Sequence, residues 1–501
     1  MKPAARVRRP EEIELKLALT TSEPTGLAGR LARTPLLARR QATRQRLHNI
    51  YYDTPEQSLR KAHVALRLRR VGSGANAQWL QTLKTAGEGV SALSRRGEWE
   101  TPVAGPALEW GAMEGSPWPV IDPDGVVFPA LRPCFVTDFE RTRWVVRRRD
   151  RSVVEVALDV GEIAVGDRRA PVCELEFELL AGEPSALFEL AGQIAHGMAV
   201  LPSSMSKAER GYALAQQTLD APLRAQPPRL SAGLALSDAS RLALCEMFGQ
   251  FIANLNVLRG SDDPEVVHQA RIGWRRFKGA CRLFGPVPAG AGAPPSLPLR
   301  SLVTLLGELR DLDVALTETL PPLADAYMGG DTRRIEAWQA LVHALSEAAT
   351  LQRKAVRYAL EEPGVGAALL AITQWLEGSV ERSGPESAAA EQKLTARRWA
   401  RHRMTQLHKR LRQARKVAGD AASQHRVRIL AKRLRYSIEA LRNLLPKHRA
   451  QRWLEEAEGL QASLGADRDV TQVAVIAASL DVDAGVVEFL RGVALGRKTA
   501  E

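Results

Sequence analysis

Two patterns of hydrophobic positions divide the chain. Between about residues 10 and 180, apolar and polar residues alternate in seven or eight short runs, among them ELKLAL, VALRLRR, QWLQTLK, GEWETPV, RTRWVV, VVEVALDV and CELEFELL. This period of two predicts half-buried β-strands. From about residue 236 onward, segments rich in Ala, Leu, Arg and Gln repeat their apolar positions with a helical period. We therefore expect an α+β protein with two domains, a β-barrel or sheet followed by an all-α domain.

A proline-rich segment separates the two patterns. The sequence DAPLRAQPPRLSAG follows the last strand-like region, and its prolines break any helix. We expect a first domain at 8–215, a linker at 216–235 and a helical domain at 236–495.

The polar faces of the predicted strands are charged. Antiparallel strands that close into a barrel point alternate side chains into the lumen, so these charges would converge there. Carboxylates bind hard cations such as Mg²⁺ or Mn²⁺, while Arg and Lys hold phosphate oxygens. A metal beside cationic clamps is the arrangement that catalyses phosphoryl transfer. The candidate metal ligands are Glu12, Glu14, Asp159, Glu174, Glu176 and Glu178, and the basic candidates are Lys16, Arg67, Arg69, Lys84, Arg141, Arg143, Lys207 and Arg210. Glu98, Glu100 and Glu155 lie on the same charged faces.

Charge distinguishes the two halves further. The net charge of +13 over 501 residues predicts a polyanionic partner. The excess is concentrated in residues 391–450, which contain 18 basic and 3 acidic residues. The four cysteines include no CxxC pair, which predicts free thiols in a reducing compartment. With neither an apolar leader nor an apolar run near the roughly 20 residues of a membrane helix, we expect a cytoplasmic protein without a membrane segment.

The helical half contains an internal repeat. His268 is followed by Arg271, Arg275 and Lys278, and His425 is followed 157 positions later by Arg428, Lys432 and Arg435 at the same offsets. The downstream motifs LGELRD (306–311) and LGADRD (464–469) have nearly the same separation. We predict two copies of a helical unit that face each other. Their basic stripes would comprise His268, Arg271, Arg275, Lys278, Arg282, Arg401, His402, Lys409, Arg412, His425, Arg428, Lys432 and Arg435.

The first half resembles the CYTH domains, or triphosphate tunnel metalloenzymes. EIELK matches their ExExK signature, and YYDTPEQSLRKAHVALRLRR, LKT, ERTRW, EVALDVGEI, ELEFELL and SKAERGY follow in order over about residues 10–213. The resemblance implies an eight-stranded antiparallel barrel that acts on triphosphates with Mg²⁺ or Mn²⁺. It also implies metal ligation by Glu12, Glu14, Glu176 and Glu178, with Asp159 and Glu174 close by, and catalytic roles for Glu12, Glu14, Lys16 and Lys84. Gly97 separates Arg96 from Glu98, which leaves the register of Arg96 open.

The second half resembles the CHAD domains. HQARIGWRRFKGACRLF, LLGELRDLDV and HRVRILAKRLRYSIEAL are the matching segments, spread over about residues 236–495. The resemblance implies two four-helix repeats around a basic groove that binds inorganic polyphosphate. Nucleic acid is an alternative ligand, although Trp399 and Tyr436 are the only nearby aromatic residues for base stacking. The histidines are poor metal ligands because their helical neighbours are cationic.

These observations predict an inorganic triphosphatase that cleaves tripolyphosphate to pyrophosphate and phosphate, joined to a polyphosphate-binding domain. Alternative enzymatic activities are hydrolysis of thiamine triphosphate or of a nucleoside triphosphate, and cyclisation of ATP. An organic group would need aromatic side chains at one tunnel end, and alternation points Trp99 and Trp144 away from the charged face. The non-enzymatic alternative is a scaffold that binds polyphosphate or nucleic acid.

Overall fold

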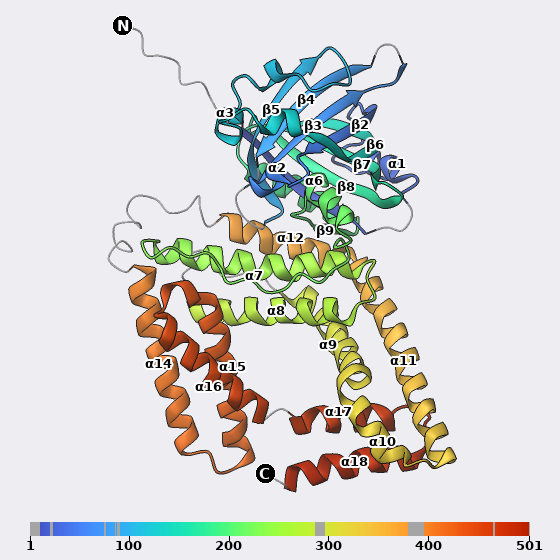
Figure 1. The fold of residues 1–501 in the computed structure, drawn as a ribbon, viewed down its shortest axis with the longest axis vertical. Coiled ribbons are helices and arrows are strands. Elements are labelled where there is room, and N and C mark those ends of the chain that lie inside the picture. The colour runs from blue at the N-terminus through green and yellow to red at the C-terminus, as the bar shows by residue number, and fades with distance from the viewer. Residues whose placement is uncertain are drawn as a thin grey trace. The chain divides into compact units, whose positions relative to one another are not determined.

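The computed structural model describes residues 11–20, 24–74, 77–85, 87, 91–285, 296–378, 395–463 and 466–499. The chain forms two compact units (Figure 1). One comprises Met1–Ala221 together with Glu361–Glu377, and the other comprises Pro222–Leu360 and Gly378–Glu501.

The first unit is built on a closed antiparallel barrel of eight strands. Their order around the barrel is β5-β4-β3-β2-β6-β7-β8-β1, and β1 returns to pair with β5. A short ninth strand, β9 (Val200–Pro202), pairs with the end of β1. The eight strands are β1 (Glu11–Leu19), β2 (Thr43–Asp53), β3 (Val64–Val71), β4 (Gln78–Thr85), β5 (Leu93–Val103), β6 (Arg132–Arg147), β7 (Val153–Val165) and β8 (Arg168–Ala181).

The apolar face of the barrel points outward. Along β1, Leu15 and Leu17 are fully buried on the outside, while Glu14 and Lys16, which alternate with them, face the lumen. The outer side chains pack beneath α1 (Leu27–Ala32) and α5 (Ser185–Ala195). The core therefore lies between the barrel wall and its helices, which leaves the lumen free for polar chemistry.

Short helices complete the wall at other points. The helix α2 (Ser58–Lys61) precedes β3, and a turn of 3₁₀-helix (Trp110–Met113), α3 (Trp118–Ile121) and α4 (Val127–Ala130) connect β5 to β6 around a core that includes Trp118. The helix α6 (Lys207–Ala215) begins at a capping box between Ser206 and Glu209, which fixes where Lys207 leaves the chain. A Cβ atom at Gly211 would lie 2.2 Å from the Phe135 ring, so this helix position requires glycine.

One helix from the later sequence belongs to the barrel's unit. The helix α12 (Pro363–Gly378) places Leu370 in the outer core with α5 and β1. A Cβ atom at Gly366 would lie 2.1 Å from the carbonyl oxygen of Val200 in β9, so the two segments are in close contact. The sequence pattern placed this helix with the helical domain, because the hydrophobic pattern of a helix does not show which domain the helix packs against. The boundaries at 215 and 236 stay predictions.

The second unit is entirely helical in its described part. Its first half contains α7 (Leu236–Leu258), α8 (Pro264–Phe284), α9 (Arg300–Val314), a π-helical turn (Ala315–Thr319), α10 (Ala324–Met328) and α11 (Thr332–Leu360). Its second half contains α14 (Ala396–Lys416), α15 (Ala421–Leu441), α16 (Lys447–Ser463), α17 (Ala466–Ala478) and α18 (Ala484–Thr499). Four short 3₁₀ turns occur in the described chain at 110–113, 297–299, 321–323 and 442–444.

The internal repeat is visible in the packing. The helix α7 packs on α8 as α14 packs on α15, and α8 contacts α15, so the two copies face each other. Ala239, Ala243 and Met247 of α7 are buried, and the same residue types are buried 157 positions later on α14. The first LG..RD motif lies within α9, whereas Leu464 and Gly465 of the second lie outside the described residues. The expected α+β organisation, with an eight-stranded barrel and an all-α C-terminal part, is confirmed.

Candidate active site

The barrel lumen contains a cavity of about 990 Å³. Eleven of the predicted metal- and phosphate-binding side chains line it. Ten occupy alternate positions on strands whose other face is apolar, and Lys207 comes from the start of α6. The eleven are Glu12, Glu14, Lys16, Arg67, Arg69, Lys84, Arg141, Arg143, Glu176, Glu178 and Lys207. Three others lie behind this lining. Asp159 and Glu174 are almost fully buried, and Arg210 pairs with Glu174 at 3.6 Å.

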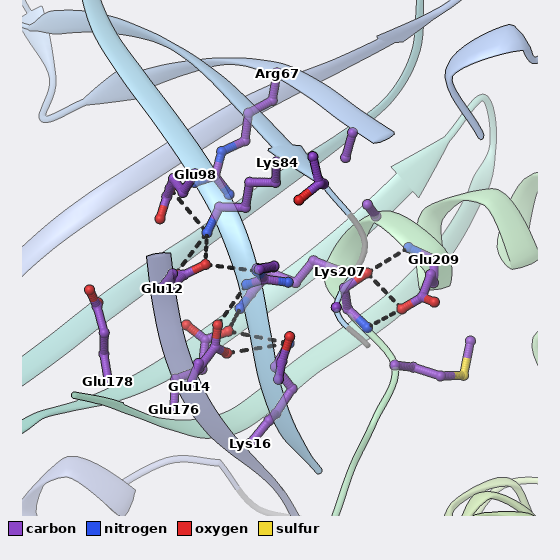
Figure 2. Close-up of a pocket in the computed structure, with 18 of the residues that line it drawn as sticks. Glu12, Glu14, Lys16, Arg67, Lys84, Glu98, Glu176, Glu178, Lys207 and Glu209 are labelled. Atoms are coloured by element: carbon purple, nitrogen blue, oxygen red, sulfur yellow. Dashed lines mark hydrogen bonds and ion pairs between the residues drawn. The ribbon is translucent and has the colours of Figure 1, made fainter. Parts of the chain in front are cut away.

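The first group of charges joins β1 to β4 and β5. Lys84 Nζ lies 2.9 Å from a carboxylate oxygen of Glu12 and 3.0 Å from one of Glu98 (Figure 2). Arg96 donates to Glu12 at 2.7 Å and to Glu14 at 2.6 Å. Burial disfavours the charged form of Glu12, but Lys84 and Arg96 outweigh it and hold the pKa of this carboxyl well below its usual range.

The second group surrounds Lys207 at the start of α6. Its Nζ lies 2.6 Å from Asp159, 2.5 Å from Glu174 and 2.8 Å from Glu176. Arg141 adds a bidentate contact to Asp159, at 2.7 and 2.6 Å, and also donates to Glu176. Burial opposes charge at Glu176, yet Lys207, Arg141 and Lys16 together keep its pKa well below its usual range.

Glu14 is the least compensated of these carboxylates. Its side chain is almost fully buried, and its Oε1 accepts no hydrogen bond. Lys16 Nζ lies 3.6 Å from this oxygen. Burial and the neighbouring Glu176 raise the pKa of Glu14. A free buried oxygen beside a second carboxylate fits a divalent cation with oxygen ligands.

A second acidic arrangement is already filled by an ammonium group. Oxygens of Asp159, Glu174 and Glu176 lie within 4.8 Å of one another, as ligands of one ion do. Lys207 Nζ contacts an oxygen of all three. A metal between these oxygens would have to displace Lys207. The free oxygen of Glu14 is open to a cation, and the neighbouring Glu176 would join it by exchanging a contact with Lys207 or Arg141 for the metal.

Glu178 lies in the cavity on β8, opposite Glu14 of β1 and Glu155 of β7. Burial and repulsion by Glu12, Glu155 and Glu98 raise its pKa to about 7. A folded-state pKa above the unfolded value means that the carboxylate is destabilising once it ionises, so stability falls as pH rises from about 4.5 to about 7.

Glu178→Gln should therefore change the pH dependence of stability. In chelator-treated protein, the free energy of unfolding of the variant should match wild type below about pH 4.5 and exceed it by about 1–3 kcal/mol above about pH 8. Urea unfolding at several pH values measures this difference. Glu162→Gln on the same strand pair, where the carboxylate is about half exposed, should show no such trend. Parallel pH profiles for Glu178→Gln and wild type would contradict the assignment.

The cationic wall opposite has unused donors. Arg67 is buried, and its Nε and Nη2 make no hydrogen bond, while Nη1 lies 3.5 Å from the Tyr51 hydroxyl. Arg69 donates to Asn49 at 2.9 Å. Burial and repulsion by Arg67 and Arg141 lower the pKa of Arg69 to about 10. An oxyanion bound here would relieve the repulsion and satisfy the free N–H groups.

Three residues of this site were absent from the predicted charged positions: Asn49, Tyr51 and Arg96. The signal for Arg96 was present, because it shares the alternating face of Glu98 and Glu100, and Gly97 does not shift the register. A Cβ atom at Gly97 would lie 2.3 Å from the Trp99 ring, so the glycine makes room for this ring.

The tryptophans lie away from the lumen. Trp144 is fully buried in the outer core, and Trp99 packs against the core that includes Trp118. Among the described residues, the aromatic side chains that line the cavity are Tyr51, Phe139 and Tyr212, each less than a tenth exposed. The expectation that Trp99 and Trp144 point away from the charged face agrees with this placement.

The predicted basic stripes lie on helices of the second unit. Partly or fully exposed side chains on α8, α14 and α15 carry them, and these are His268, Arg271, Arg275, Lys278, Arg282, Arg401, His402, Lys409, Arg412, His425, Arg428, Lys432 and Arg435. Burial and the guanidinium of Arg310 lower the pKa of His268. This cationic environment disfavours a metal at the histidine.

The glycine of the LGELRD motif lies beside one member of the basic stripe. A Cβ atom at Gly307 on α9 would lie 2.7 Å from Nη1 of Arg271 on α8. The guanidinium therefore lies close to the α9 backbone at this glycine.

Two family models match the chain. The CYTH domain model matches residues 10–212, and the CHAD domain model matches residues 242–476. The chain therefore carries a CYTH domain followed by a CHAD domain.

An inorganic triphosphatase of Haemophilus influenzae is 35% identical to this chain over 204 residues, which are 41% of this chain and 55% of that protein. The chain thus matches about half the length of this curated relative. Among solved structures, the CHAD domain from the plant Ricinus communis is 31% identical, covering 56% of this chain and 92% of that chain with a TM-score of 0.47. A putative adenylyl cyclase from Hippeastrum, described as having a dominant triphosphatase activity, is 22% identical over 40% of this chain and 95% of its own, with a TM-score of 0.30. No helix in the described ranges has both the length and the apolar character needed to cross a membrane.

Proposed function

We propose that the barrel is a metal-dependent inorganic triphosphatase that hydrolyses tripolyphosphate to pyrophosphate and phosphate. The observation that carries this proposal is the pairing, in one closed lumen, of a cationic wall that has free donors with a buried carboxylate that has a free oxygen. Hydrolysis of a phosphoanhydride needs both: cations hold and neutralise the phosphates, and an acidic pair holds the metal.

The side chains divide the work by charge. Arg67, Arg69 and Arg141 bind phosphate oxygens. The planar guanidinium group of arginine can donate two parallel hydrogen bonds to one phosphate. Glu14 and Glu176 would hold Mg²⁺ or Mn²⁺, which when bound neutralises phosphate charge and polarises a water molecule. Water attacks one terminal phosphorus in line, and pyrophosphate leaves from the opposite side.

The internal ion pairs keep the empty lumen neutral. Lys84 and Arg96 pair with Glu12, and Lys207, Arg141 and Lys16 together compensate Asp159, Glu174 and Glu176. Lys84 and Arg96 can exchange carboxylate contacts for contacts with a polyanion, and a cation bound with the polyanion would compensate the carboxylates that they release. Substrate and metal are therefore expected to bind with positive cooperativity.

The lining favours an inorganic substrate. In the described part of the cavity wall no tryptophan is present, and the three aromatic rings are too buried to stack on a thiamine or a nucleobase. The Haemophilus influenzae relative, which is named an inorganic triphosphatase, supports the same substrate.

A substrate panel tests the reaction. Phosphate release from tripolyphosphate in Mg²⁺ or Mn²⁺ should exceed that from ATP and thiamine triphosphate by at least about tenfold in kcat/KM, and chelation should abolish it. Release favouring thiamine triphosphate or ATP would select a different triphosphate enzyme. No metal-dependent release from any substrate would leave the scaffold alternative.

We also propose that the helical unit binds inorganic polyphosphate through its basic stripes. The double variant Arg428→Ala/Lys432→Ala removes two charges from α15 and should weaken polyphosphate binding about tenfold, with a smaller salt dependence. Arg333→Ala, an exposed arginine of α11, is the matched control. Fluorescence anisotropy with labelled polyphosphate and with single-stranded DNA measures both ligands. Equal affinity for the two would indicate a general polyanion surface.

A further inference from the structure

A group of arginines, of which only Arg282 belongs to the predicted stripes, lies where α8, α14 and α15 meet. It comprises Arg282 of α8, Arg403 and Arg410 of α14, and Arg433 of α15, and is called here the Arg433 cluster. Arg403 and Arg433 are half-buried, and the Nε atom of each is buried without a hydrogen-bond partner. Within the described ranges, none of the four forms an ion pair with a carboxylate, and α14 contains no acidic residue.

The internal repeat supplies a reference for this cluster. The counterpart of Arg433 in the first copy is Arg276, 157 positions earlier on α8. Arg276 is only 1% exposed and donates to Gln250 at 2.5 Å. Its Nε lies 3.3 Å from Glu439 of α15, and Glu246 of α7 adds a second negative charge near it. Carboxylates from both copies, Glu246 of the first and Glu439 of the second, therefore compensate the charge of this buried arginine.

The second copy has arginine at both corresponding positions. Arg403 lies 157 positions after Glu246, and Arg282 lies 157 positions before Glu439. The alignment is secured by the identical buried residues of α7 and α14 described above. The stacked rings of Phe284 and Trp399, 5.4 Å apart, and the contact of Gly279 with Tyr436 hold α8 against α14 and α15 at this corner. Two acid-to-arginine exchanges thus surround Arg433 with positive charge.

This arrangement costs free energy unless an anion is present. Burial and repulsion by Arg403, Arg410 and Arg282 lower the pKa of Arg433. Partly buried charges that lack a counter-charge destabilise a fold. The planar forks of arginine match the oxygens of phosphoryl groups in bidentate contacts.

We propose that the Arg433 cluster is a binding site for a phosphoryl oxyanion, located where the first helical copy has its arginine–glutamate contacts. At 100° per residue, Arg433 lies on the flank of α15 opposite Arg428 and Arg435, with the apolar face between them. Arg433 itself is not a member of the predicted stripe, whose residues His425 and Lys432 lie about 80° and about 100° away around the helix, and the cluster meets the stripes at Arg282. The ligand is inorganic phosphate or pyrophosphate, or a phosphoryl group of a longer chain, and the site does not depend on the proposed reaction in the barrel.

Calorimetry on the full chain with phosphate, pyrophosphate and long polyphosphate tests the site. Arg410→Gln changes an exposed arginine of the cluster, and Arg403→Glu copies the glutamate of the first copy. Arg410→Gln should weaken binding at least about fivefold for the anion that the cluster takes, and Arg403→Glu should abolish that binding. The anion whose binding weakens identifies the ligand. Weaker binding of phosphate and pyrophosphate indicates a small ligand, and weaker binding of polyphosphate alone indicates a chain. Arg491→Gln, an exposed arginine paired with Glu488, is the control for a lost charge.

A stability measurement gives a second, independent readout. Without added anion, Arg403→Glu should raise Tm relative to wild type, because Arg433 gains the carboxylate that Arg276 already has. Added pyrophosphate or polyphosphate should raise Tm of wild type and not of Arg403→Glu. Unchanged tripolyphosphate hydrolysis in both variants separates this site from the barrel. Wild-type binding of all three anions by both cluster variants would overturn the proposal, as would a Tm of Arg403→Glu at or below that of wild type without anion.

Discussion

Glu14→Gln is expected to reduce kcat/KM for tripolyphosphate hydrolysis by about a thousandfold, which corresponds to about 4 kcal/mol of transition-state stabilisation. The free Oε1 of Glu14 is the oxygen that would ligate the cation, and an amide in its place is a poorer ligand without charge. The amide keeps an acceptor for Arg96, which donates to the other oxygen at 2.6 Å. Phosphate release in saturating Mg²⁺ or Mn²⁺ measures the loss.

The same variant should not be destabilised. Burial and Glu176 raise the pKa of Glu14, so its ionised form is a cost to the metal-free fold, and a neutral amide removes that cost. Tm in chelator should be equal to or above that of wild type. Glu162→Gln, which changes a half-exposed carboxylate of β7, should leave both activity and Tm unchanged. Retention of more than a tenth of wild-type kcat/KM by Glu14→Gln would remove Glu14 from the metal site.

Alternation along the strands predicted which side chains share the lumen, since parity alone decides the face of a strand. It could not predict their pairing. Lys207 is brought to Asp159 and Glu176 by the capping box that begins α6, and that helix lies outside the alternating pattern. The orientation of the apolar face was also open, because a charged outer surface and a charged lumen give the same alternation. The apolar side chains of the strands pack beneath α1 and α5 on the outside of the barrel, so the charged side chains face the lumen.

The strand β2 shows where the pattern fails. Its lumen-facing residues include Gln45, Asn49 and Tyr51, which are uncharged, and its outer face has His48 and Arg46 paired with Asp138. The contrast between its two faces is therefore weak, and no alternating run marked it in the sequence. Its place between β3 and β6 depends on pairing across the barrel.

The repeat in the helical half carried more information than the histidine stripes. The spacing of 157 aligned His268 with His425, and the same spacing aligns Arg276 with Arg433. Arg276 is paired with carboxylates, whereas Arg433 lies among other arginines. One cause of this difference is that α7 has a glutamate, Glu246, where α14 has Arg403. A repeat predicts equivalent backbones, whereas the side chains around each copy decide whether a charge is neutralised from within or needs a ligand.

Lys207→Met is expected to lower the free energy of unfolding of the barrel unit by about 3–5 kcal/mol at pH 7, with Tm lower by about 10 °C. The substitution leaves Asp159, Glu174 and Glu176 buried without the ammonium that contacts all three. Arg141 remains for Asp159 and Glu176, and Lys16 lies 3.9 Å from Glu174 and 3.6 Å from Glu176, but neither group contacts all three carboxylates as Lys207 does. Urea or thermal unfolding in chelator measures the loss.

The pH dependence identifies the cause of this loss. In wild type, Lys207 and Arg141 overcome burial and keep the pKa values of Asp159 and Glu176 below their usual range, so these groups contribute stability above about pH 4 that is lost as pH falls through the lowered values. In the variant the uncompensated carboxylates have raised pKa values, so protonation at lower pH relieves their repulsion. The stability gap between wild type and Lys207→Met should therefore be largest near pH 8 and shrink toward pH 5. Lys61→Met, which removes an exposed lysine of α2, should cost less than about 0.5 kcal/mol at either pH. A gap of the same size at pH 5 and pH 8 would mean that Lys207 acts through packing, and the three carboxylates would then not be the charges that it neutralises.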